Sequence, residues 1–355
     1  MEVFIFFTTI IASFFVTILV IYGMCQFGII DIPRSLARKI HKKKIPLGGG
    51  VAPFLIFSLA IYFLYSFKYI GIEISGKSLI GIILGASIVI IGGIIDDKKN
   101  VKPMVQIIFP TLAAMTVIAF GIGPHQITNP LGGVVPLDEM NFSFGKFGTF
   151  VVFADIVVFL WLMGVMYTTK LLDGLDGLVS GITVIGALMI FFLTRQPLWY
   201  QPEVGLVAIA LAGALLGFLI WNWNPAKIFL GEGGSLFCGF IIGVLAIISG
   251  SKIATTLLVL AIPVLDLLRV FAMRIKNKKP FYVGDNEHLH FKLLSKGFSH
   301  KQTVLLFYLF SLLFGLLGVF VQNKFKIMTL ILLFLLMIIG GIFFTKKDTN
   351  LNRYE

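Results

Sequence analysis

The chain has 355 residues, of which 58% are hydrophobic and only 13% charged, and its mean hydropathy is +0.98. Soluble domains carry about 25% charged residues, so this composition excludes an ordinary soluble protein. A formal net charge of +12 would suggest nucleic-acid binding in a soluble protein, but no soluble basic domain is present to carry it. Basic residues that flank membrane spans explain the charge better, and we exclude nucleic acid as a partner.

The apolar residues come in runs of about 20, the length of helix that crosses ~30 Å of hydrocarbon. Backbone in lipid must satisfy its own hydrogen bonds, so the runs are predicted to be helices. The expected fold is all-α, a polytopic integral membrane protein with about 10–11 transmembrane helices in one domain, 1–355. The predicted spans are 3–24, 47–67, 78–95, 103–122, 149–169, 177–193, 204–221, 234–250, 253–273, 303–321 and 326–345.

The segments between these spans form two alternating sets of very different charge. One set carries 22 of the 29 Lys and Arg residues, and the other carries seven. The basic set consists of 25–46, 96–102, 170–176, 222–233, 274–302 and the C-terminus, and Arg269 is counted with the segment 274–302. Basic loops stay in the cytoplasm, which predicts an N-terminus outside and cytoplasmic active-site loops. The longest outer loop, 123–148, contains several turn signals and is expected to form a short hairpin or an irregular cap.

Four groups of acidic residues lie at span ends on the side of the basic set of loops. Each costs roughly 2.5–3.5 kcal/mol at bilayer depth, so they are rarely placed there without a partner. Taken singly, each group has a structural explanation, such as pairing with neighbouring lysines, helix capping, or solvation in a glycine-rich turn. The groups are Asp96 with Asp97, Asp173 with Asp176, Glu232, and Asp266 near the inner end of span 253–273.

Together, the first three acidic groups have the character of a site for a hard cation. Mg²⁺ prefers oxygen ligands and usually takes one or two carboxylates together with substrate phosphates. Glycines beside these acids permit close backbone approach, and helix N-termini favour phosphate. A metal ion among several carboxylates indicates phosphoryl chemistry rather than structural metal binding.

Two other basic loops carry candidate residues. His288-Leu289-His290 resembles half of a zinc site, but no cysteine or third close ligand completes it. Contact with a pyrophosphate or proton transfer is favoured there, and two solvated loop histidines are the alternative. The loop with Arg38, His41 and Lys42 is either a membrane anchor or a cationic rim that attracts a lipid phosphate and a nucleotide. The triple glycine that follows it, at 48–50, predicts close approach of another backbone.

In combination these loops resemble the polyprenyl-phosphate N-acetylhexosamine-1-phosphate transferases. That family includes the UDP-GlcNAc:undecaprenyl-phosphate GlcNAc-1-phosphate transferases and the phospho-N-acetylmuramoyl-pentapeptide translocases. The resemblance runs from about residue 31 to 302, with the motifs in the family's order. The matching segments are Arg38-Lys39-Ile40-His41 with Pro46 and Gly48-Gly49; Asp96-Asp97; Asp173-Gly174-Leu175-Asp176; Asn222 with 225–235; Pro263 and Asp266 with Arg274; and His288-Leu289-His290.

The resemblance implies a role for each matching residue. The implied catalytic residues lie at the reacting phosphates or the sugar, one of the adjacent aspartates acting as a base, and are Asp96, Asp97, Asp173, His288 and His290. The implied ligands of Mg²⁺, with Mn²⁺ as an alternative ion, are Asp97, Asp173 and Glu232. The predicted substrate-binding residues are Arg38, His41, Lys42, Lys170, Gly174, Leu175, Asp176, Asn222 and Phe229. Among them the resemblance implies that 174–176 line a uridine pocket and that Phe229 stacks on uracil.

Several positions depart from the family pattern. The acid of its Gly-Asp-x-Gly-Ser motif is Glu232 here, and a third histidine is replaced by Phe291. Two expected asparagines are Tyr167 and Lys170. Lys170 brings a cation where a neutral amide is expected, so it could form a salt bridge with Asp173 or itself neutralise phosphate charge. These departures suggest a divergent branch.

The implied reaction transfers a sugar 1-phosphate, with GlcNAc favoured, from a UDP-sugar to polyprenyl (undecaprenyl) phosphate and releases UMP. It would take place at the plasma membrane, at the start of a cell-envelope glycan pathway. The alternatives are a phospho-N-acetylmuramoyl-pentapeptide transferase, a transporter, and a non-catalytic member of the fold. A transporter is disfavoured because the acidic groups lie at span ends, and only Asp155 is a mid-span candidate. The oligomeric state is open, with a homodimer as one possibility.

Overall fold

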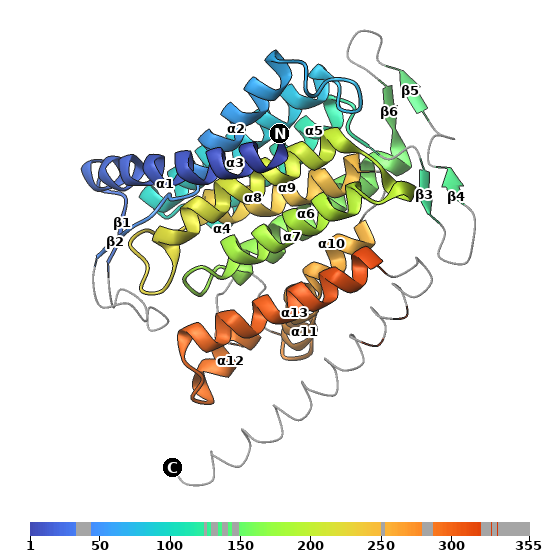
Figure 1. Ribbon diagram of the computed structural model, residues 1–355. Helices are drawn as coiled ribbons and strands as arrows, with labels where there is room; N and C mark the ends of the chain where they lie inside the picture. Colours follow the sequence, from blue (N-terminus) through green and yellow to red (C-terminus); the bar gives the residue numbers. More distant parts are fainter. Residues whose placement is uncertain are drawn as a thin grey trace, which may run out of the picture.

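The computed structural model describes residues 1–32, 44–123, 126–128, 134–136, 141–143, 149–249, 253–278, 287–320, 328 and 332. Arg38, His41 and Lys42 lie outside these ranges, as does all but two residues of the predicted span 326–345. The described chain is a bundle of helices with a few very short strands (Figure 1).

The helices follow the predicted spans closely. They are α1 (Glu2–Gln26), α2 (Val51–Ser66), α3 (Gly76–Lys99), α4 (Pro103–Gln106), α5 (Ile108–Ala119), α6 (Val152–Leu172), α7 (Leu178–Thr194), the 3-10 helix η2 (Pro197–Trp199), α8 (Pro202–Asn222), α9 (Gly231–Ile248), α10 (Ile253–Val259), α11 (Ala261–Lys276), α12 (Leu289–Ser295) and α13 (His300–Phe320).

Six helices are long and apolar enough to cross a membrane, namely α1, α3, α6, α8, α9 and α13. Helices α10 and α11 pass the same test as a bent pair, and α2, α4 with α5, and α7 are shorter apolar helices. Every predicted span up to 303–321 therefore has its helix or helix pair. The prediction of an all-α, multi-pass membrane protein is confirmed.

The predicted span 253–273 is not one straight helix. Helix α10 ends at Val259, α11 begins at Ala261, and their axes are bent by 79°. Pro263 lies in the first turn of α11, where it has no N–H to donate and its ring clashes with the carbonyl four residues earlier. The prediction of a continuous span was wrong for this physical reason.

Helices α8 and α9 form the centre of the bundle (Figure 1). Within the apolar stretch of each helix, 89% of α9 and 78% of α8 is buried, against 28% of α1. Helix α1 packs on α8 through small residues, with Thr9 against Gly213 and Ser13 against Gly217. Small side chains let membrane helices approach closely enough for van der Waals packing to hold them together.

Three antiparallel two-stranded ladders connect helices. They are β1 (Ile30–Asp31) with β2 (Ile45–Pro46), β3 (Gln126–Thr128) with β4 (Val134–Pro136), and β5 (Asn141–Ser143) with β6 (Thr149–Val151). The β3–β4 hairpin lies inside the segment 123–148, where a short hairpin was one of the two predicted forms. The β1–β2 ladder brings the two ends of the first basic loop together just before α2.

Candidate functional site

A cavity of about 420 Å³ opens where α3, α6 and α8 end and where α7, α9 and α13 begin. Its volume is in the range usual for small-molecule sites, ~300–1,000 Å³. Residues far apart in the sequence meet in its walls because successive helices bring their ends to the same side of the bundle. The lining residues are Asp31, Leu47, Asp97, Lys170, Asp173, Gly174, Leu175, Asp176, Asn222, Asn224, Phe229, Leu230, Gly231, Glu232, Ser235, Phe291 and His300.

Glycines allow the backbones around the cavity to touch. Gly93 of α3 lies directly against Gly233 of α9, and Gly50 lies against Gly234, so a Cβ at either place would collide with backbone. The N–H of Gly50 donates to Leu230 O over 2.9 Å, and the N–H of Gly49 donates to Phe229 O over 2.9 Å. The triple glycine at 48–50 therefore meets the segment that leads into α9, the kind of close approach its sequence predicts.

Asp97 lies in the last turn of α3, and its side chain contacts the start of α9. Its Oδ1 accepts a hydrogen bond from the N–H of Glu232 over 3.1 Å. Its Oδ2 is buried and has no hydrogen-bond partner among the residues that the structure describes. Gly231, with φ of +79°, lies so close to this oxygen that a Cβ would collide with it. A buried carboxylate oxygen without a partner is costly, so this atom is suited to a proton or a cation.

The side chain of Asp96 points away from the cavity, towards Val101 and Gln106. Its Oδ1 accepts hydrogen bonds from Val101 N over 2.8 Å and from Gln106 Nε2 over 3.1 Å, and its Oδ2 accepts from the same Nε2 over 3.1 Å. Asp96 is not among the described residues that line the cavity. The sequence placed both adjacent aspartates at the reacting groups, whereas the structure brings only Asp97 there.

Lys170 lies near the end of α6 and forms an ion pair with Glu232 at the start of α9. Its ammonium also donates to Gln106 Oε1 over 2.9 Å and lies 5.5 Å from the centre of the Tyr167 ring. Of the two suggested roles for Lys170, the salt bridge is made with Glu232 rather than with Asp173. Two of the departures from the family pattern, Lys170 and Glu232, are therefore in contact with each other.

Asp173 and Asp176 lie in the turn between α6 and α7. The Asp173 side chain is open to the cavity but surrounded by its walls, and desolvation there raises its pKa well above the ordinary value. The nearby carboxylates of Glu232, Asp97 and Asp176 raise this pKa further. Asp176 Oδ2 accepts from Asn224 Nδ2 over 2.8 Å and from Ala226 N over 3.1 Å, which ties this turn to the segment after α8.

Asn222 is buried and joins the same two segments. Its Oδ1 accepts from Gly177 N over 3.0 Å and from Ser180 Oγ over 2.9 Å, and its Nδ2 donates to Ile228 O over 3.0 Å. The sequence placed Asn222 among substrate-binding residues. The structure places it in the cavity wall, where most of its hydrogen-bonding capacity holds the wall itself together.

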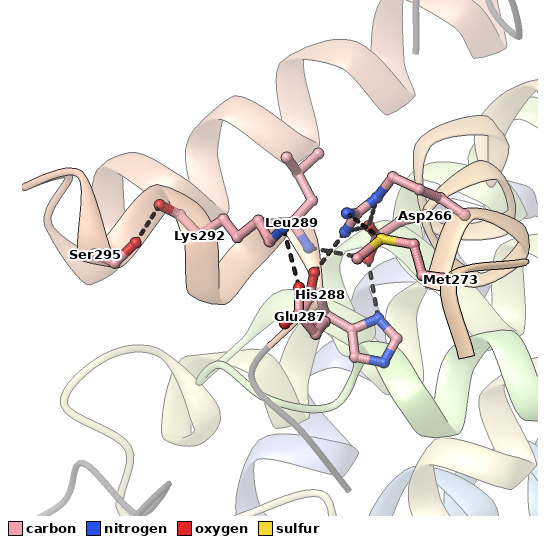
Figure 2. A network of polar contacts seen from close by, with 8 residues as sticks. Asp266, Met273, Glu287, His288, Leu289, Lys292 and Ser295 are labelled. Atoms are coloured by element: carbon pink, nitrogen blue, oxygen red, sulfur yellow. Dashed lines mark hydrogen bonds and ion pairs between the residues drawn. The ribbon is translucent and has the colours of Figure 1, made fainter. Parts of the chain in front are cut away.

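His288 belongs to a polar network with Asp266 and Leu289 (Figure 2), and it is not among the described residues that line the cavity. Its Nδ1 is 3.0 Å from Asp266 Oδ2, which also accepts from Leu289 N over 3.0 Å. The other oxygen of Asp266 accepts from Arg269 over 2.7 Å. This arrangement fixes the orientation of the His288 ring and anchors the start of α12 to α11.

His290 is almost completely buried, and neither ring nitrogen has a hydrogen-bond partner among the described residues. The ring packs against Gly174 and lies 4.3 Å from the Phe291 ring, centre to centre. Burial and the nearby charge of His288 lower the pKa of His290 to about 3, so the ring stays neutral. Neither histidine of the predicted pair lines the cavity in the described part of the chain, whereas Phe291 does.

The three predicted magnesium ligands share a cavity, but the structure does not test whether they bind the ion. Asp97, Asp173 and Glu232 line one cavity, but no three His, Cys, Asp or Glu side chains in the described ranges are grouped closely enough to hold a metal ion. Glu232 is also engaged by Lys170. The hard oxygen donors of Asp97 and Asp173 fit Mg²⁺, which commonly takes one or two carboxylates and completes its shell with substrate phosphates and water. Metal binding stays a prediction.

Sequence reasoning assigned no role to several residues of the site. Three of them line the cavity, namely Asn224, Ser235 and His300. The fourth, Gln106, accepts a hydrogen bond from the Lys170 ammonium. The only available signal was position, since all four lie within a few residues of a span end in the basic set of loops. Their types are common in solvated loops, so the sequence alone could not single them out.

Comparison with known proteins supports the motif-based resemblance. The model of glycosyl transferase family 4 matches residues 79–250, which contain Asp97, Lys170, Asp173 and Glu232. The chain is 28% identical, over 326 residues, to a probable undecaprenyl-phosphate N-acetylglucosaminyl 1-phosphate transferase of Bacillus subtilis, covering 88% of this chain and 83% of that protein.

Other relatives carry two further names. A decaprenyl-phosphate N-acetylglucosaminephosphotransferase of Mycobacterium tuberculosis is 28% identical over 340 residues, covering 85% of this chain and 78% of that protein. A phospho-N-acetylmuramoyl-pentapeptide-transferase of Oceanobacillus iheyensis is 30% identical over 339 residues, covering 88% of this chain and 97% of that protein. Because the chain is 30% identical to the Oceanobacillus protein and covers 97% of it, and because several of the family's motif residues meet in one cavity, the chain belongs to the polyprenyl-phosphate sugar-1-phosphate transferases of glycosyl transferase family 4.

Proposed function

We propose that this protein transfers an N-acetylhexosamine 1-phosphate, with GlcNAc favoured, from a UDP-sugar to polyprenyl phosphate and releases UMP. The observation that carries the proposal is the meeting of Asp97, Asp173 and Glu232 in one cavity at the helix ends. The names of the Bacillus and Mycobacterium relatives support the lipid acceptor and the GlcNAc group. The basic loops beside this cavity support a cytoplasmic site in the plasma membrane.

In the proposed reaction an oxygen of the lipid phosphate attacks the β-phosphorus of the UDP-sugar. A new P–O bond forms between the lipid phosphate oxygen and the β-phosphorus, the bond between the β-phosphorus and the oxygen that bridges to the α-phosphorus breaks, and UMP departs with that bridging oxygen. Both reactants are anionic, so their approach requires compensating positive charge. Bound Mg²⁺ would supply charge neutralisation at the diphosphate, and Asp97 and Asp173 would hold it.

Residues of the cavity wall would have the other roles in the proposed reaction. Lys170 contributes a fixed positive charge at the cavity wall, where the donor phosphates would lie. Of the adjacent aspartates, Asp97 is the one able to act there, because Asp96 is occupied by Val101 and Gln106. The turn 174–176 and Phe229 line the cavity and would hold the nucleoside, with the aromatic ring stacking on the base.

The test is a donor screen on the purified protein with undecaprenyl phosphate and Mg²⁺. Each reaction contains one radiolabelled UDP-sugar, and both labelled lipid and released UMP are measured. We expect equal amounts of the two products with UDP-GlcNAc, and no labelled lipid when EDTA replaces Mg²⁺. A correctly folded protein that forms no product with any UDP-sugar would refute the proposal and favour a non-catalytic member of the fold.

A second candidate is phospho-N-acetylmuramoyl-pentapeptide transfer. It is favoured by the Oceanobacillus relative, of which the chain covers 97%. The same screen separates the two candidates when UDP-N-acetylmuramoyl-pentapeptide is included as a donor. Product from that donor in preference to UDP-GlcNAc would establish the second activity.

A further inference from the structure

We propose that Gln106 is a positioning residue that holds the Lys170 ammonium at the cavity wall, and that Asp96 fixes the orientation of the Gln106 amide. The inference deepens the proposed function, because Lys170 is expected to meet the donor phosphates. It assigns a role to Gln106, and it gives Asp96 a different role from the catalytic one implied by the sequence motif.

The contacts form a continuous chain across four structural elements. Asp96 at the end of α3 accepts two bonds of 3.1 Å from Gln106 Nε2, and Gln106 Oε1 in α4 accepts from Lys170 Nζ over 2.9 Å. Lys170 at the end of α6 then pairs with Glu232 at the start of α9. Only Lys170 and Glu232 of these four are among the described residues that line the cavity.

The polarity of these bonds follows from the chemistry of the groups. An ionised carboxylate only accepts hydrogen bonds and an ammonium only donates them, whereas an amide does one at each end. Asp96 therefore demands the NH₂ end of Gln106 and leaves the carbonyl oxygen to Lys170. Val101 also holds both partners, since its N–H donates to Asp96 over 2.8 Å and its carbonyl accepts from Gln106 over 3.1 Å.

The arrangement has a consequence for charge at the cavity. The side chain of lysine is a flexible stem of four carbons, and it loses considerable rotamer freedom when its ammonium is held in one place. The side chains of Lys170 and Glu232 are only 16% and 19% exposed, so their charges interact in a partly desolvated setting. Without Gln106, Glu232 would be the one polar partner of the ammonium among the residues that the structure describes, and the ammonium would spread over more rotamers.

The first experiment is a kinetic double-mutant cycle with the donor identified in the screen. We expect Gln106→Met to lower kcat about tenfold and to change KM little, because a hydrogen bond to a charged group is lost while the cavity keeps its shape. In a Lys170→Met background the same replacement should have almost no further effect. Gln196→Met, at the opposite end of the bundle, is the matched control and should leave kcat unchanged.

A charge exchange tests the role of Asp96. Gln106→Glu alone should be worse than Gln106→Met, because it sets two carboxylates against each other. The double replacement Asp96→Asn with Gln106→Glu restores a donor facing an acceptor and keeps an acceptor for Lys170, so kcat should recover to within about threefold of wild type. Failure of this recovery, or independent effects of the Gln106 and Lys170 replacements, would overturn the proposal.

A third measurement does not depend on catalysis. Lysine acylation followed by mass spectrometry reports how freely Lys170 reacts, and Gln106→Met should raise its labelling rate about threefold or more by releasing the ammonium. Lys227 is exposed on the segment after α8 and provides the internal control, whose rate should not change. An unchanged rate at Lys170 overturns the positioning role even if no donor sugar is found, so this failure is distinct from failure of the proposed function.

Discussion

Asp96 and Asp97 show how far apart the roles of adjacent residues can be. Successive positions on a helix point in directions about 100° apart, so the two carboxylates at the end of α3 leave the helix on different faces. One faces α4 and is satisfied by Val101 and Gln106, while the other faces α9 and keeps an oxygen without a partner in the described ranges. Their expected contributions to catalysis differ accordingly.

Replacement of Asp97 by Asn should abolish most of the activity while the fold is kept. The amide oxygen can still accept the bond from Glu232 N–H, but the negative charge at the cavity is lost. We expect a decrease in kcat of roughly 10³-fold, about 4 kcal/mol of transition-state stabilisation. The measurement is label transfer from UDP-GlcNAc to undecaprenyl phosphate.

The control for that measurement is Asp155→Asn. Asp155 is also a buried acid with a backbone N–H partner, Val151, but it lies at the start of α6, away from the cavity. Its replacement should leave the rate close to that of wild type. Equal losses from the two replacements would show that the Asp97 effect is one of folding.

His290 should make the protein less stable in acid. Its folded pKa of about 3 lies below the ordinary value of 6.5, so the unfolded chain binds the proton first and stability falls as the pH drops from about 6.5 towards 3. Between pH 7.5 and 5 this loss should be about 2 kcal/mol, and the His290→Gln variant should lack it. Thermal unfolding in detergent at the two pH values measures the difference, and identical pH dependence of both proteins would contradict it.

At the scale of elements, pairs of glycines decide how closely the helices around the site approach. Gly93 on α3 and Gly233 on α9 place two backbones in direct contact, which brings Asp97 to the first turn of α9. Hydrophobic side chains would hold these helices farther apart, and the hydrogen bond from Glu232 N–H to Asp97 would be lost. Packing between helices therefore builds the site as much as the acidic residues do.

Gly93→Ala should destabilise the protein by about 2 kcal/mol, the usual cost of overpacking a tight contact. The matched control is Gly164→Ala on α6, where a Cβ would meet no atom within 4 Å of the described structure. That replacement should be neutral or stabilising by up to about 1 kcal/mol, because alanine favours helix. The free energy of unfolding of each variant is measured in mixed detergent and compared with that of wild type. Similar changes in both variants would show that the α3–α9 contact is not tight.

At the scale of the whole molecule, the cavity lies at one end of the bundle and its orientation in the membrane follows from charge. The ends of α3, α6 and α8 that surround it belong to the loops that carry 22 of the 29 Lys and Arg residues. The positive-inside rule predicts that this end faces the cytoplasm. A nucleotide donor, as proposed, would then reach the site from the cytoplasm.

Cysteine labelling tests that orientation with the two ends of one helix. After Cys25 and Cys238 are replaced by Ser, Lys77→Cys and Lys99→Cys place single thiols at the exposed start and end of α3. A membrane-impermeant maleimide should label the first in intact cells and the second only after permeabilisation. The reverse pattern would place the cavity outside and refute a cytoplasmic site.

The sequence by itself determined the class of fold and the neighbourhood of the site. Runs of about 20 apolar residues leave helix as the only way to satisfy the backbone in lipid, so the spans could be predicted from composition alone. Acidic and glycine residues at span ends indicated which loops meet, because the membrane confines every span end to one of two faces.

The tertiary structure alone decided which side chain does what within that neighbourhood. Asp96 turns away from the cavity, and Lys170 pairs with Glu232 instead of Asp173. Gln106 forms hydrogen bonds to both Asp96 and Lys170 and so connects them. The pairing of His288 with Asp266, outside the described lining of the cavity, could not be predicted from the sequence either. The physical reason is that direction and pairing depend on helix rotation and on contacts between distant segments, which hydrophobic runs and local motifs do not specify.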